Sequence, residues 1–547
     1  MKKKHSNLGN ANIPTYQTLK EIIVKGTQAG GDKRQFVFLD KEKNECIRTF
    51  NQTWAEMTAL GTYFSTKGLN GKKKIAIIGE NCYEWMITYY ATLVGGNITV
   101  PMDCKLPADD LADQLIRCGC DALVITEKFV QMAEDFKNNP DMPEMVYFNI
   151  SDEYDMYLAE GKKALDAGDT SCIDAKVEPD DLACIAYTSG TTAKSKGVML
   201  THFNISSNCS ASCRALSGRH AIGFLPLHHT YAWVSALFSS YILSEWGYVC
   251  DGIGNIQGDL QKYQPYNFSG VPLVVETIYK RIWKTAKKTG REEVLKKGLK
   301  ISRFLMKLGI DRRRKIFKTI IDNLGGNLNM IICGAANLDP KIEQGMHDFG
   351  IEIYNGYGLT ECSPAVTCNR PDKFRFGSVG TPLDCCEIKI VNPDEDGVGE
   401  IYVKGQNVMK GYYNDPEATA AVFDGEWLIT GDHGRIDKDG FLFMVGRKKN
   451  LICLSNGKNV SPEELEDKLS RIDYVKEVLV YDENNKIVAE FFFDEVEYPD
   501  ARSRIKEDID EFNRNMPLFK NVNSIKIRDT EFPKTTTLKI ARKNTNK

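Results

Sequence analysis

The sequence predicts an α/β protein: a large N-terminal domain of two parallel αβαβα layers with a small β-barrel subdomain, followed by a small, mobile α+β domain. Three observations lead to this prediction. Short β-type runs alternate with helical stretches from about Tyr16 to Phe148 and again from Gly223 onward, as in parallel α/β layers. Short β segments dominate from Ser378 to Phe443. A polar run, GRKKN, then separates about 100 residues with a strand and helix pattern of their own.

Length and composition restrict the classes of function. The chain has 547 residues, more than one ordinary domain holds, and its 71 basic and 74 acidic residues nearly balance. We therefore expect no nucleic-acid partner and at most peripheral contact with a membrane. The 16 cysteines show no paired CxxC spacing, so we expect reduced, mostly buried thiols. No signal peptide and no run of roughly 20 apolar residues is evident, which predicts a cytoplasmic location.

The first α/β layer is expected from four runs in the N-terminal part. Lys73–Gly79, Ile98–Asp103 and Asp121–Thr126 are apolar and rich in β-branched residues, which favours strands. The longer run Tyr83–Gly96 predicts the helix between the first two strands. The GxGxxG pattern of a dinucleotide-binding fold is absent, so these elements are interpreted as structural.

A loop with the sequence YTSGTTAKSKGV, Tyr187 to Val198, follows the apolar run Leu182–Ala186. Gly, Ser and Thr bury little area and favour turns, so the stretch predicts either a plain flexible connection or a loop that binds a ligand. Its backbone N–H groups, hydroxyls and lysines suit the anionic oxygens of a polyphosphate. The P-loop pattern requires Gly-Lys-Ser/Thr, whereas Lys196 is followed by glycine, which indicates a different class of nucleotide enzyme.

The second layer is expected from the runs Gly223–Trp233, Asn267–Trp283 and Met330–Leu338. Between them, Lys284–Asp322 is a basic amphipathic region. We interpret it as a solvated helical surface with its cations outward, and keep a membrane-surface element as the alternative, because a lipid-like substrate would give such an element a purpose.

A second polar cluster, YNGYGLTECSP, spans Tyr354–Pro364. Glu361 offers a carboxylate and Thr360 a hydroxyl, which suit Mg²⁺ and a phosphate, while Tyr357 offers a flat face for a base. A lone glutamate in a loop is otherwise simply solvated.

The motifs resemble those of the adenylate-forming superfamily, which includes acyl-CoA synthetases, peptide-synthetase adenylation domains and luciferases. YTSGTTAKSKGV is similar to its phosphate loop, YTSGTTGxPKGV, with Ala193 for Gly and Ser195 for Pro. YGLTE matches YGxTE, and ITGDHG and GRKKNLI match the ribose motifs. FPKTTTLKIARK is similar to PKTxxGKIxR, with Leu538 for Gly. The resemblance runs from about Tyr16 to Lys543 and is strongest to bacterial long-chain fatty acid–CoA ligases.

The resemblance implies roles for individual residues. Thr360 would bind phosphate, Glu361 would hold Mg²⁺, and Lys539 would stabilise charge at the α-phosphate as the catalytic lysine. Asp432 and Arg447 would bind the ribose. The residues expected to bind ATP are Thr188, Ser189, Gly190, Thr191, Thr192, Lys196, Gly334, Ala335, Ala336, Tyr357, Gly358, Asp432 and Arg447.

The same resemblance implies two domains, an N-terminal AMP-binding domain over residues 1–446 and a mobile C-terminal domain over residues 447–547. Lys449 falls at the position of the hinge. Within the tail, Ser461 and Pro462 predict a helix start, because serine caps a helix and proline suits its first position. A further helix is expected from Arg502 to Asn513.

Five residues are expected to line an acyl pocket: His229, Trp233, Val271, Pro272 and Gly356. The resemblance places His229 as an aromatic wall and Trp233 as a tunnel gate, with ordinary core packing as the alternative. An apolar lining suits a fatty chain and also an aryl acid.

The implied reaction is ATP-dependent activation of a carboxylic acid, a medium- or long-chain fatty acid, to acyl-AMP. Transfer to the thiol of coenzyme A then releases AMP. ATP, Mg²⁺ and coenzyme A are the expected cofactors. Three alternatives stay open: an acyl-AMP ligase that loads a separate phosphopantetheinyl carrier protein, a coenzyme A ligase for aryl or other acids, and a non-catalytic acyl-adenylate sensor.

Overall fold

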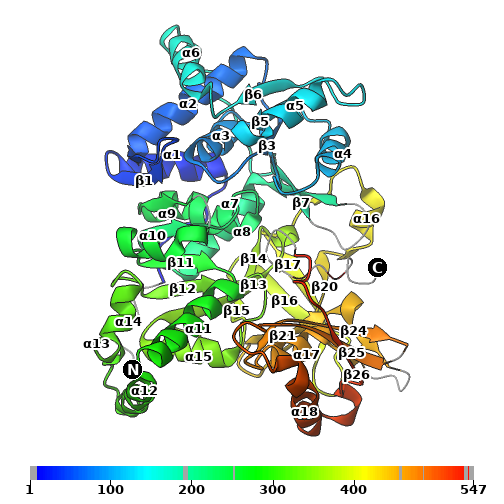
Figure 1. Ribbon diagram of the computed structural model, residues 1–547. Coiled ribbons are helices and arrows are strands. Elements are labelled where there is room, and N and C mark those ends of the chain that lie inside the picture. Colours follow the sequence, from blue (N-terminus) through cyan, green and yellow to red (C-terminus); the bar gives the residue numbers. More distant parts are fainter. Residues whose placement is uncertain are drawn as a thin grey trace. The chain divides into compact units, whose positions relative to one another are not determined.

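The computed structural model describes residues 9–188, 195–250, 253–454, 459–484, 486–534, 540 and 542 (Figure 1). It contains two compact units. Unit 1 consists of Met1–Glu387 and Lys404–Phe423, and unit 2 consists of Ile388–Val403 and Asp424–Lys547. Parallel sheets with crossover helices fill unit 1, so the predicted mixed α/β class, with a large and a smaller domain, is confirmed.

The first sheet of unit 1 has seven strands in the order β18-β8-β7-β4-β3-β5-β6. The five strands from β7 to β6 run parallel, β8 pairs with β7 in antiparallel fashion, and β18 pairs with β8 in the same way. Their bounds are β3 (Lys74–Ile78), β4 (Ile98–Met102), β5 (Ala122–Ile125), β6 (Val146–Asn149), β7 (Leu182–Thr188), β8 (Lys196–Thr201) and β18 (Gly411–Tyr412). The predicted strands at 73–79, 98–103 and 121–126 are therefore confirmed as β3, β4 and β5.

The second sheet of unit 1 has nine strands in the order β15-β14-β13-β12-β11-β9-β10-β1-β2. The six strands from β13 to β1 are parallel, so their carboxyl ends lie along one edge. The bounds are β1 (Arg34–Leu39), β2 (Glu45–Thr49), β9 (Ala221–Gly223), β10 (Gly247–Val249), β11 (Asn267–Gly270), β12 (Met330–Cys333), β13 (Glu352–Gly358), β14 (Ala365–Cys368) and β15 (Thr381–Pro382).

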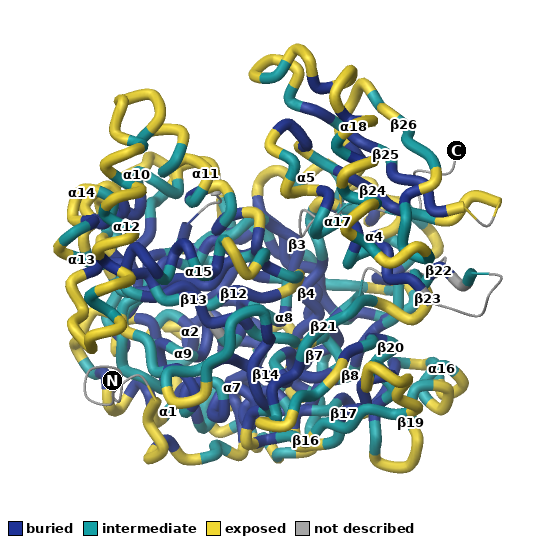
Figure 2. Tube along the Cα trace, turned by 90° about the horizontal axis from the view of Figure 1, so that it is seen from below, coloured by how far each residue is buried: buried dark blue, intermediate teal, exposed yellow. Residues whose placement is uncertain are grey.

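Helices connect and cover these strands. The α-helices of unit 1 are α1 (Leu19–Gly30), α2 (Phe50–Thr66), α3 (Tyr83–Val94), α4 (Ala108–Cys118), α5 (Val130–Lys137), α6 (Tyr154–Asp166), α7 (His202–Ala215), α8 (Thr230–Ala232), α9 (Ser239–Leu243), α10 (Ile256–Tyr263), α11 (Pro272–Lys288), α12 (Glu292–Lys307), α13 (Arg313–Ile316), α14 (Lys318–Asn323), α15 (Pro340–Phe349) and α16 (Pro416–Ala420). Reciprocal capping boxes start two of them, Thr49 with Gln52 at α2 and Thr201 with Asn204 at α7. Strands of both sheets are largely buried, whereas α12 to α14 carry many exposed residues (Figure 2).

Unit 2 contains a five-stranded sheet of β16 (Cys386–Val391), β17 (Gly399–Gly405), β19 (Phe423–Asp424), β20 (Trp427–Ile436) and β21 (Leu442–Arg447), in which β20 pairs antiparallel with β17 and β21. The sequence places these strands before a boundary at residue 446. They group with the tail because β21 packs on α17 (Pro462–Leu469) and because Ser461 Oγ donates a 2.6 Å hydrogen bond to Val445 O.

The tail of unit 2 has its own hydrophobic core. Leu465, Val480, Phe491 and Ile505 are buried in it, between helices and a three-stranded sheet. Its elements are β22 (Ile452–Cys453), β23 (Asn459–Val460), α17, β24 (Val475–Glu483), β25 (Lys486–Phe493), α18 (Ala501–Arg514) and β26 (Ser524–Ile527). Ser461 caps α17 and Pro462 is its first residue, as predicted.

Two further properties concern the described ranges only. The 15 cysteines whose side chains are described are free thiols, and most are buried. Every described helix is too short or too polar to cross a lipid bilayer.

Candidate functional site

The carboxyl edge of the nine-stranded sheet gathers residues that are far apart in the sequence. Val271 directly follows β11, and residues 334–336 directly follow β12. Gly356 and Gly358 lie at the carboxyl end of β13. His229 lies in the connection that follows β9. Ligands of parallel α/β sheets bind outside the carboxyl ends of the strands, so this edge is the candidate site in unit 1.

The end of β13 is a tightly packed turn. A Cβ atom on Gly358 would lie 1.9 Å from the carbonyl oxygen of Pro364, so only glycine fits there. The chain then enters the short 3₁₀ helix η4 (Thr360–Cys362). Buried Asn407 donates to the carbonyl oxygens of Cys362 (3.0 Å) and Ala365 (2.9 Å), which fixes the backbone that carries Thr360 and Glu361.

The predicted phosphate loop connects β7 and β8 in the other sheet of unit 1. Thr188 and Lys196 are opposite each other at the open end of this antiparallel pair. The strand ladder therefore fixes both ends of the loop. The predicted ligands Ser189, Gly190, Thr191 and Thr192 lie outside the described residues.

Ser195, which stands where the resembling motif has proline, is held by α4. Gln114 Nε2 donates to Ser195 Oγ over 3.0 Å, and Arg117 Nη1 donates to the Ser195 carbonyl oxygen over 2.9 Å. Arg117 also lies over the ring of Tyr187, 5.5 Å from its centre, and pairs with Asp113. Hydrogen bonds from a helix thus restrain the loop end where a proline ring would otherwise restrict the backbone.

A chain of contacts joins the phosphate loop to η4. Lys196 Nζ lies 4.7 Å from the ring centre of Tyr412, and Tyr412 Oη donates a 3.0 Å hydrogen bond to Glu361 Oε1. The backbone supports it, because Met409 N donates to Glu361 O (2.8 Å) and Lys410 N donates to Met199 O (3.0 Å). Burial, and then the charge of Glu361, raise the pKa of Tyr412 above its ordinary value, so its hydroxyl stays a donor.

Sequence reasoning did not identify Tyr412. Its only local signal is the pair of tyrosines after Gly411, and nothing there indicates a partner 51 residues earlier in the chain. Tyr412 reaches Glu361 because β18 pairs with β8, a contact between distant segments.

Small residues leave room beside β12. Gly334 N donates to Gly270 O over 3.2 Å, and Ala335 adopts a left-handed conformation with φ of 72°. A Cβ atom on Gly334 would be 3.5 Å from the ring of Tyr231. Tyr357, the predicted base-stacking residue, is half-buried on the neighbouring strand β13, opposite Thr367. These residues form one surface at the sheet edge.

Trp233 and His229 of the predicted acyl pocket differ in their surroundings. Trp233 is fully buried and its Nε1 donates to Leu227 O over 2.9 Å, at the start of the π-helical turn η2 (Trp233–Phe238). The ring of His229 is 4.4 Å from that of His228, whose Nε2 is 3.5 Å from Asp103 Oδ1. Burial lowers the pKa of His228 to about 3, so this ring is neutral at physiological pH.

The other three residues of the predicted pocket lie on the sheet edge. Pro272 is buried as the first residue of α11, and Val271 precedes it. Gly356 faces β14, where an added Cβ atom would be 3.0 Å from Thr367 O.

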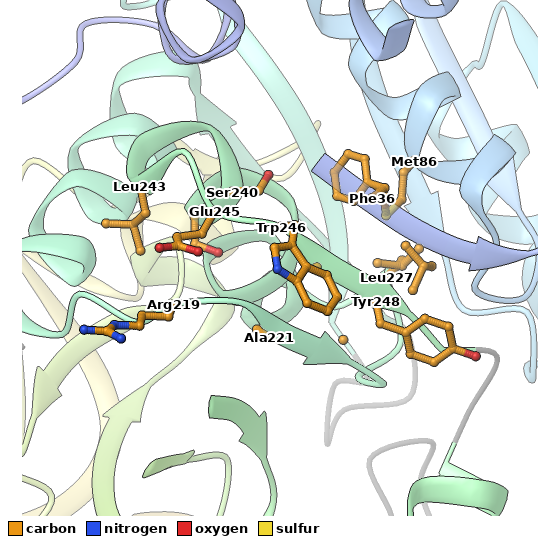
Figure 3. A pocket seen from close by; sticks show the side chains of 14 residues that line it. Phe36, Met86, Arg219, Ala221, Leu227, Ser240, Leu243, Glu245, Trp246 and Tyr248 are labelled. Atoms are coloured by element: carbon orange, nitrogen blue, oxygen red, sulfur yellow. The ribbon is translucent and has the colours of Figure 1, made fainter. Parts of the chain in front are cut away.

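A small pocket lies beside Leu227, the partner of Trp233. Phe36 of β1, Met86 of α3 and Tyr248 of β10 are among its apolar lining residues, and Figure 3 shows them around it. Its cavity volume is about 30 Å³, room for only a few water molecules. An acyl chain needs more space than this pocket provides in the arrangement described.

Unit 2 contains the predicted ribose ligands as an ion pair. Asp432 of β20 and Arg447 of β21 are opposite each other in the antiparallel ladder, and Arg447 Nε is 3.1 Å from Asp432 Oδ1. The aspartate side chain is nearly buried and the arginine side chain is half exposed. The ladder therefore presents a carboxylate and a guanidinium side by side.

Lys449 lies in the short helix η5 (Lys448–Asn450), between two anchored neighbours. Lys448 Nζ is 2.9 Å from Glu400 Oε2 of β17, and Asn450 Nδ2 donates to Glu463 Oε1 of α17 over 2.6 Å. The residue predicted as the hinge thus separates a contact to the antiparallel sheet from a contact to the tail.

Lys539, the predicted catalytic lysine, lies outside the described residues. Lys534 and Ile540, the nearest described residues on either side of it in the sequence, form an antiparallel bridge. Arg542 Nη1 donates to Val480 O over 3.0 Å, and Arg542 also pairs with Glu466. Burial raises the pKa of Glu466 to about 7 although Arg542 opposes the shift.

Residues 25–413 match the AMP-binding enzyme family, and residues 449–547 match the AMP-binding enzyme C-terminal domain. The chain is 31% identical over 468 residues to long-chain-fatty-acid–CoA ligase 1 of Cavia porcellus, covering 78% of this chain and 66% of that protein. It is 30% identical over 448 residues to long-chain-fatty-acid–CoA ligase 1 of Homo sapiens, covering 75% and 64%. The chain thus spans slightly less than two thirds of the length of these two relatives.

A solved structure with the same fold is the anthranilate CoA ligase AuaEII in complex with anthranoyl-AMP. The TM-score is 0.79 at 19% identity, over 97% of each chain. At this identity the likeness shows the fold alone, and the family match over residues 25–413 covers well over half of the chain. The chain belongs to the AMP-binding enzyme family.

Proposed function

We propose that this chain catalyses the ATP-dependent activation of a fatty acid to acyl-AMP and then transfers the acyl group to the thiol of coenzyme A. AMP and pyrophosphate are the other products. The observation that carries the proposal is the contact of Lys196 with Tyr412 and of Tyr412 with Glu361. In this contact a lysine and a carboxylate lie on either side of one tyrosine, and both come from stretches that resemble nucleotide-binding motifs.

Glu361 fits Mg²⁺. Tyr412 fixes one carboxylate oxygen, and no donor among the described residues reaches the second one. Carboxylate oxygens are the ligands that Mg²⁺ prefers. Glu361 would hold Mg²⁺, and the ion would supply positive charge that offsets negative charge on the phosphoryl oxygens.

Different residues of the chain would have different roles in the first half-reaction. Lys196 and the loop after Thr188 bind the phosphates, with Thr360 at the α-phosphate. Gly334, Ala335, Ala336, Tyr357 and Gly358 border the adenine, and Asp432 with Arg447 binds the ribose hydroxyls. A carboxylate oxygen of the acid then attacks the α-phosphorus, and pyrophosphate leaves. Lys539 stabilises the charge that develops on the phosphoryl oxygens.

The second half-reaction needs the catalytic lysine to withdraw, so that the thiol can attack the acyl carbonyl carbon and AMP can leave. We infer that residues 447–547 turn about Lys449, against an N-terminal domain of residues 1–446. The separate core of the tail supports this inference, since a segment with its own core moves as one body. So do the contacts of Lys448 and Asn450, which lie on either side of Lys449.

A fatty acid is the proposed substrate because the two long-chain-fatty-acid–CoA ligases align over three quarters of the chain. The acyl chain would enter past His229 and Trp233 and lie along Val271, Pro272 and Gly356. Trp233 is buried and hydrogen-bonded in the described arrangement, so its ring must move to open a tunnel. Coenzyme A as the acceptor and a cytoplasmic location are further predictions, which AMP release with free coenzyme A and cell fractionation would test.

ATP–pyrophosphate exchange with a panel of acids tests the proposal. The panel holds short, medium and long fatty acids together with benzoate and anthranilate. We expect the highest exchange with a medium or long fatty acid and little with the aryl acids. Highest exchange with an aryl acid would refute the substrate class, and no exchange with any acid would refute an adenylating enzyme.

A further inference from the structure

Helix α12 carries an exposed apolar strip at helical spacing. Val294, Ile301, Phe304 and the C-cap residue Leu308 are 67%, 56%, 62% and 58% exposed. The first, second and fourth of these recur every seven residues, on one side of the helix. Exposed Ile310 follows after the helix. Single exposed apolar residues are common, but a continuous strip of four marks a surface that contacts another body.

The strip is not an unpacked core face. The opposite side of α12 is already packed, with Ser302 buried, Leu295 and Leu299 half-buried, and a Cβ atom on Gly298 only 3.2 Å from the ring of Phe317. Arg303 pairs with Asp348 of α15, which holds the helix in place. The helix therefore has two apolar sides, and the side opposite the strip packs within unit 1, where α12 contacts α11, α13 and α15.

Positive charge surrounds the strip. Residues 284–318 contain 14 lysines and arginines and three acidic residues, in a chain whose net charge is −3. Lys297, Lys300 and Lys307 are exposed on α12 itself and have no ion-pair partner in the part of the chain that the structure describes. The local charge thus has the opposite sign to the whole chain.

We propose that this face of α12, defined by Val294, Ile301, Phe304 and Leu308 with Lys297, Lys300 and Lys307, docks on an anionic lipid bilayer. The lysines would contact the headgroup phosphates, and the four apolar side chains would enter the boundary with the acyl chains.

Other occupants fit the face less well. A nucleic acid would use the cations and leave the apolar strip without a partner. A second copy of the chain in a two-fold contact would bring the lysines of one copy close to those of the other. A bilayer with acidic headgroups satisfies both the charge and the apolar strip.

The proposal is tested by co-sedimentation with large vesicles, either of phosphatidylcholine alone or with about one third phosphatidylglycerol. A lysine near an anionic surface contributes about 1 kcal/mol, a factor of about five in partition coefficient. At ~0.05 M salt the variant Lys297→Gln/Lys300→Gln/Lys307→Gln should therefore lose roughly 10- to 100-fold in binding, and this difference should shrink at ~0.5 M salt because of screening. Ile301→Ser/Phe304→Ser should bind at least about tenfold more weakly at both salt concentrations.

Matched controls remove the same number of side chains elsewhere on unit 1. Lys162→Gln/Lys163→Gln/Lys176→Gln changes the net charge equally, and Ile47→Ser/Met156→Ser replaces two apolar residues that are 46% and 45% exposed. Both controls should bind the acidic vesicles like the wild type. The readout needs no catalysis, so a failed adenylation assay leaves this test intact.

Three results would overturn the proposal: no wild-type binding to acidic vesicles at low salt, equal losses in the α12 variants and their controls, or a change of oligomeric state in Ile301→Ser/Phe304→Ser in sedimentation velocity without lipid. The last result would identify the face as an interface between copies of the chain.

Discussion

Replacing Tyr412 by phenylalanine removes one hydroxyl from the candidate site and leaves the ring below Lys196. The lost hydroxyl donates to Glu361 Oε1 over 3.0 Å. A hydrogen bond to a charged group contributes about 1.5–3 kcal/mol, which corresponds to a factor of roughly 10 to 150. Without it the carboxylate is free to rotate, so we expect kcat/KM for adenylation to fall at least about tenfold and the Mg²⁺ requirement to rise.

The assay is ATP–pyrophosphate exchange as a function of Mg²⁺ concentration, with the melting temperature as a check on folding. Tyr413→Phe is the matched control, because its hydroxyl contacts Lys74 Nζ (3.1 Å) and does not touch Glu361. Tyr412→Leu removes the ring as well and should lose more activity, because Lys196 then loses its aromatic contact. If Tyr412→Phe stays within about twofold of the wild type at every Mg²⁺ concentration, Tyr412 does not position Glu361.

Four further results are expected. Asp432→Ala should abolish exchange while leaving the melting temperature of the chain nearly unchanged, and near-normal exchange would reject the ribose assignment. Ser195→Ala breaks the hydrogen bond from Gln114, so KM for ATP should rise about two- to tenfold in steady-state kinetics, and an unchanged KM would show that this anchor does not shape the loop. Burial raises the pKa of the Glu343 carboxyl to about 7, above the value of about 4.3 in an unfolded chain. The protonated carboxyl therefore contributes its full stabilisation below about pH 4. This contribution, up to ~3 kcal/mol, is lost as the pH rises to about 7. Glu343→Gln should remove this loss, seen as a melting-temperature difference from the wild type that grows with pH, and a difference that is constant with pH would contradict it. Lys539→Ala should fail to adenylate and yet convert added acyl-AMP to thioester. Lys449→Pro should adenylate and then stall, because proline fixes φ near about −65° and prevents the rotation. Equal loss of both steps in both variants would argue against domain rotation.

The sequence predicts an element of the fold well where an apolar run is bounded by polar or turn-forming residues. β3, β4 and β5 begin and end within two residues of the predicted runs, because each is an apolar stretch between polar residues. The helix α17 begins at Pro462 as predicted, because a serine cap followed by proline is a local helix-start signal. The division of the chain does not follow from local chemistry. The sheet of β16, β17, β19, β20 and β21 groups with the tail through pairing and packing that a linear sequence does not reveal.

The residues of the candidate site likewise differ in whether the local sequence predicts them. Motif residues such as Lys196 and Glu361 were identified from residue type and order, and both lie beside Tyr412. Tyr412 itself and the anchoring of Ser195 by Arg117 were not predictable. Each contact joins segments at least 51 residues apart, through a strand pairing or a helix that packs beside the loop.

A single-turnover experiment tests the central claim most directly. Enzyme in excess over α-³²P-labelled ATP is mixed with Mg²⁺ and a long-chain fatty acid without coenzyme A, quenched at intervals and analysed for labelled acyl-AMP. The wild type should accumulate acyl-AMP and convert it to acyl-CoA and labelled AMP once coenzyme A is added, while Glu361→Gln should form none. Labelled AMP that appears without an acyl-AMP intermediate, or acyl-AMP that forms normally in Glu361→Gln, would contradict the account.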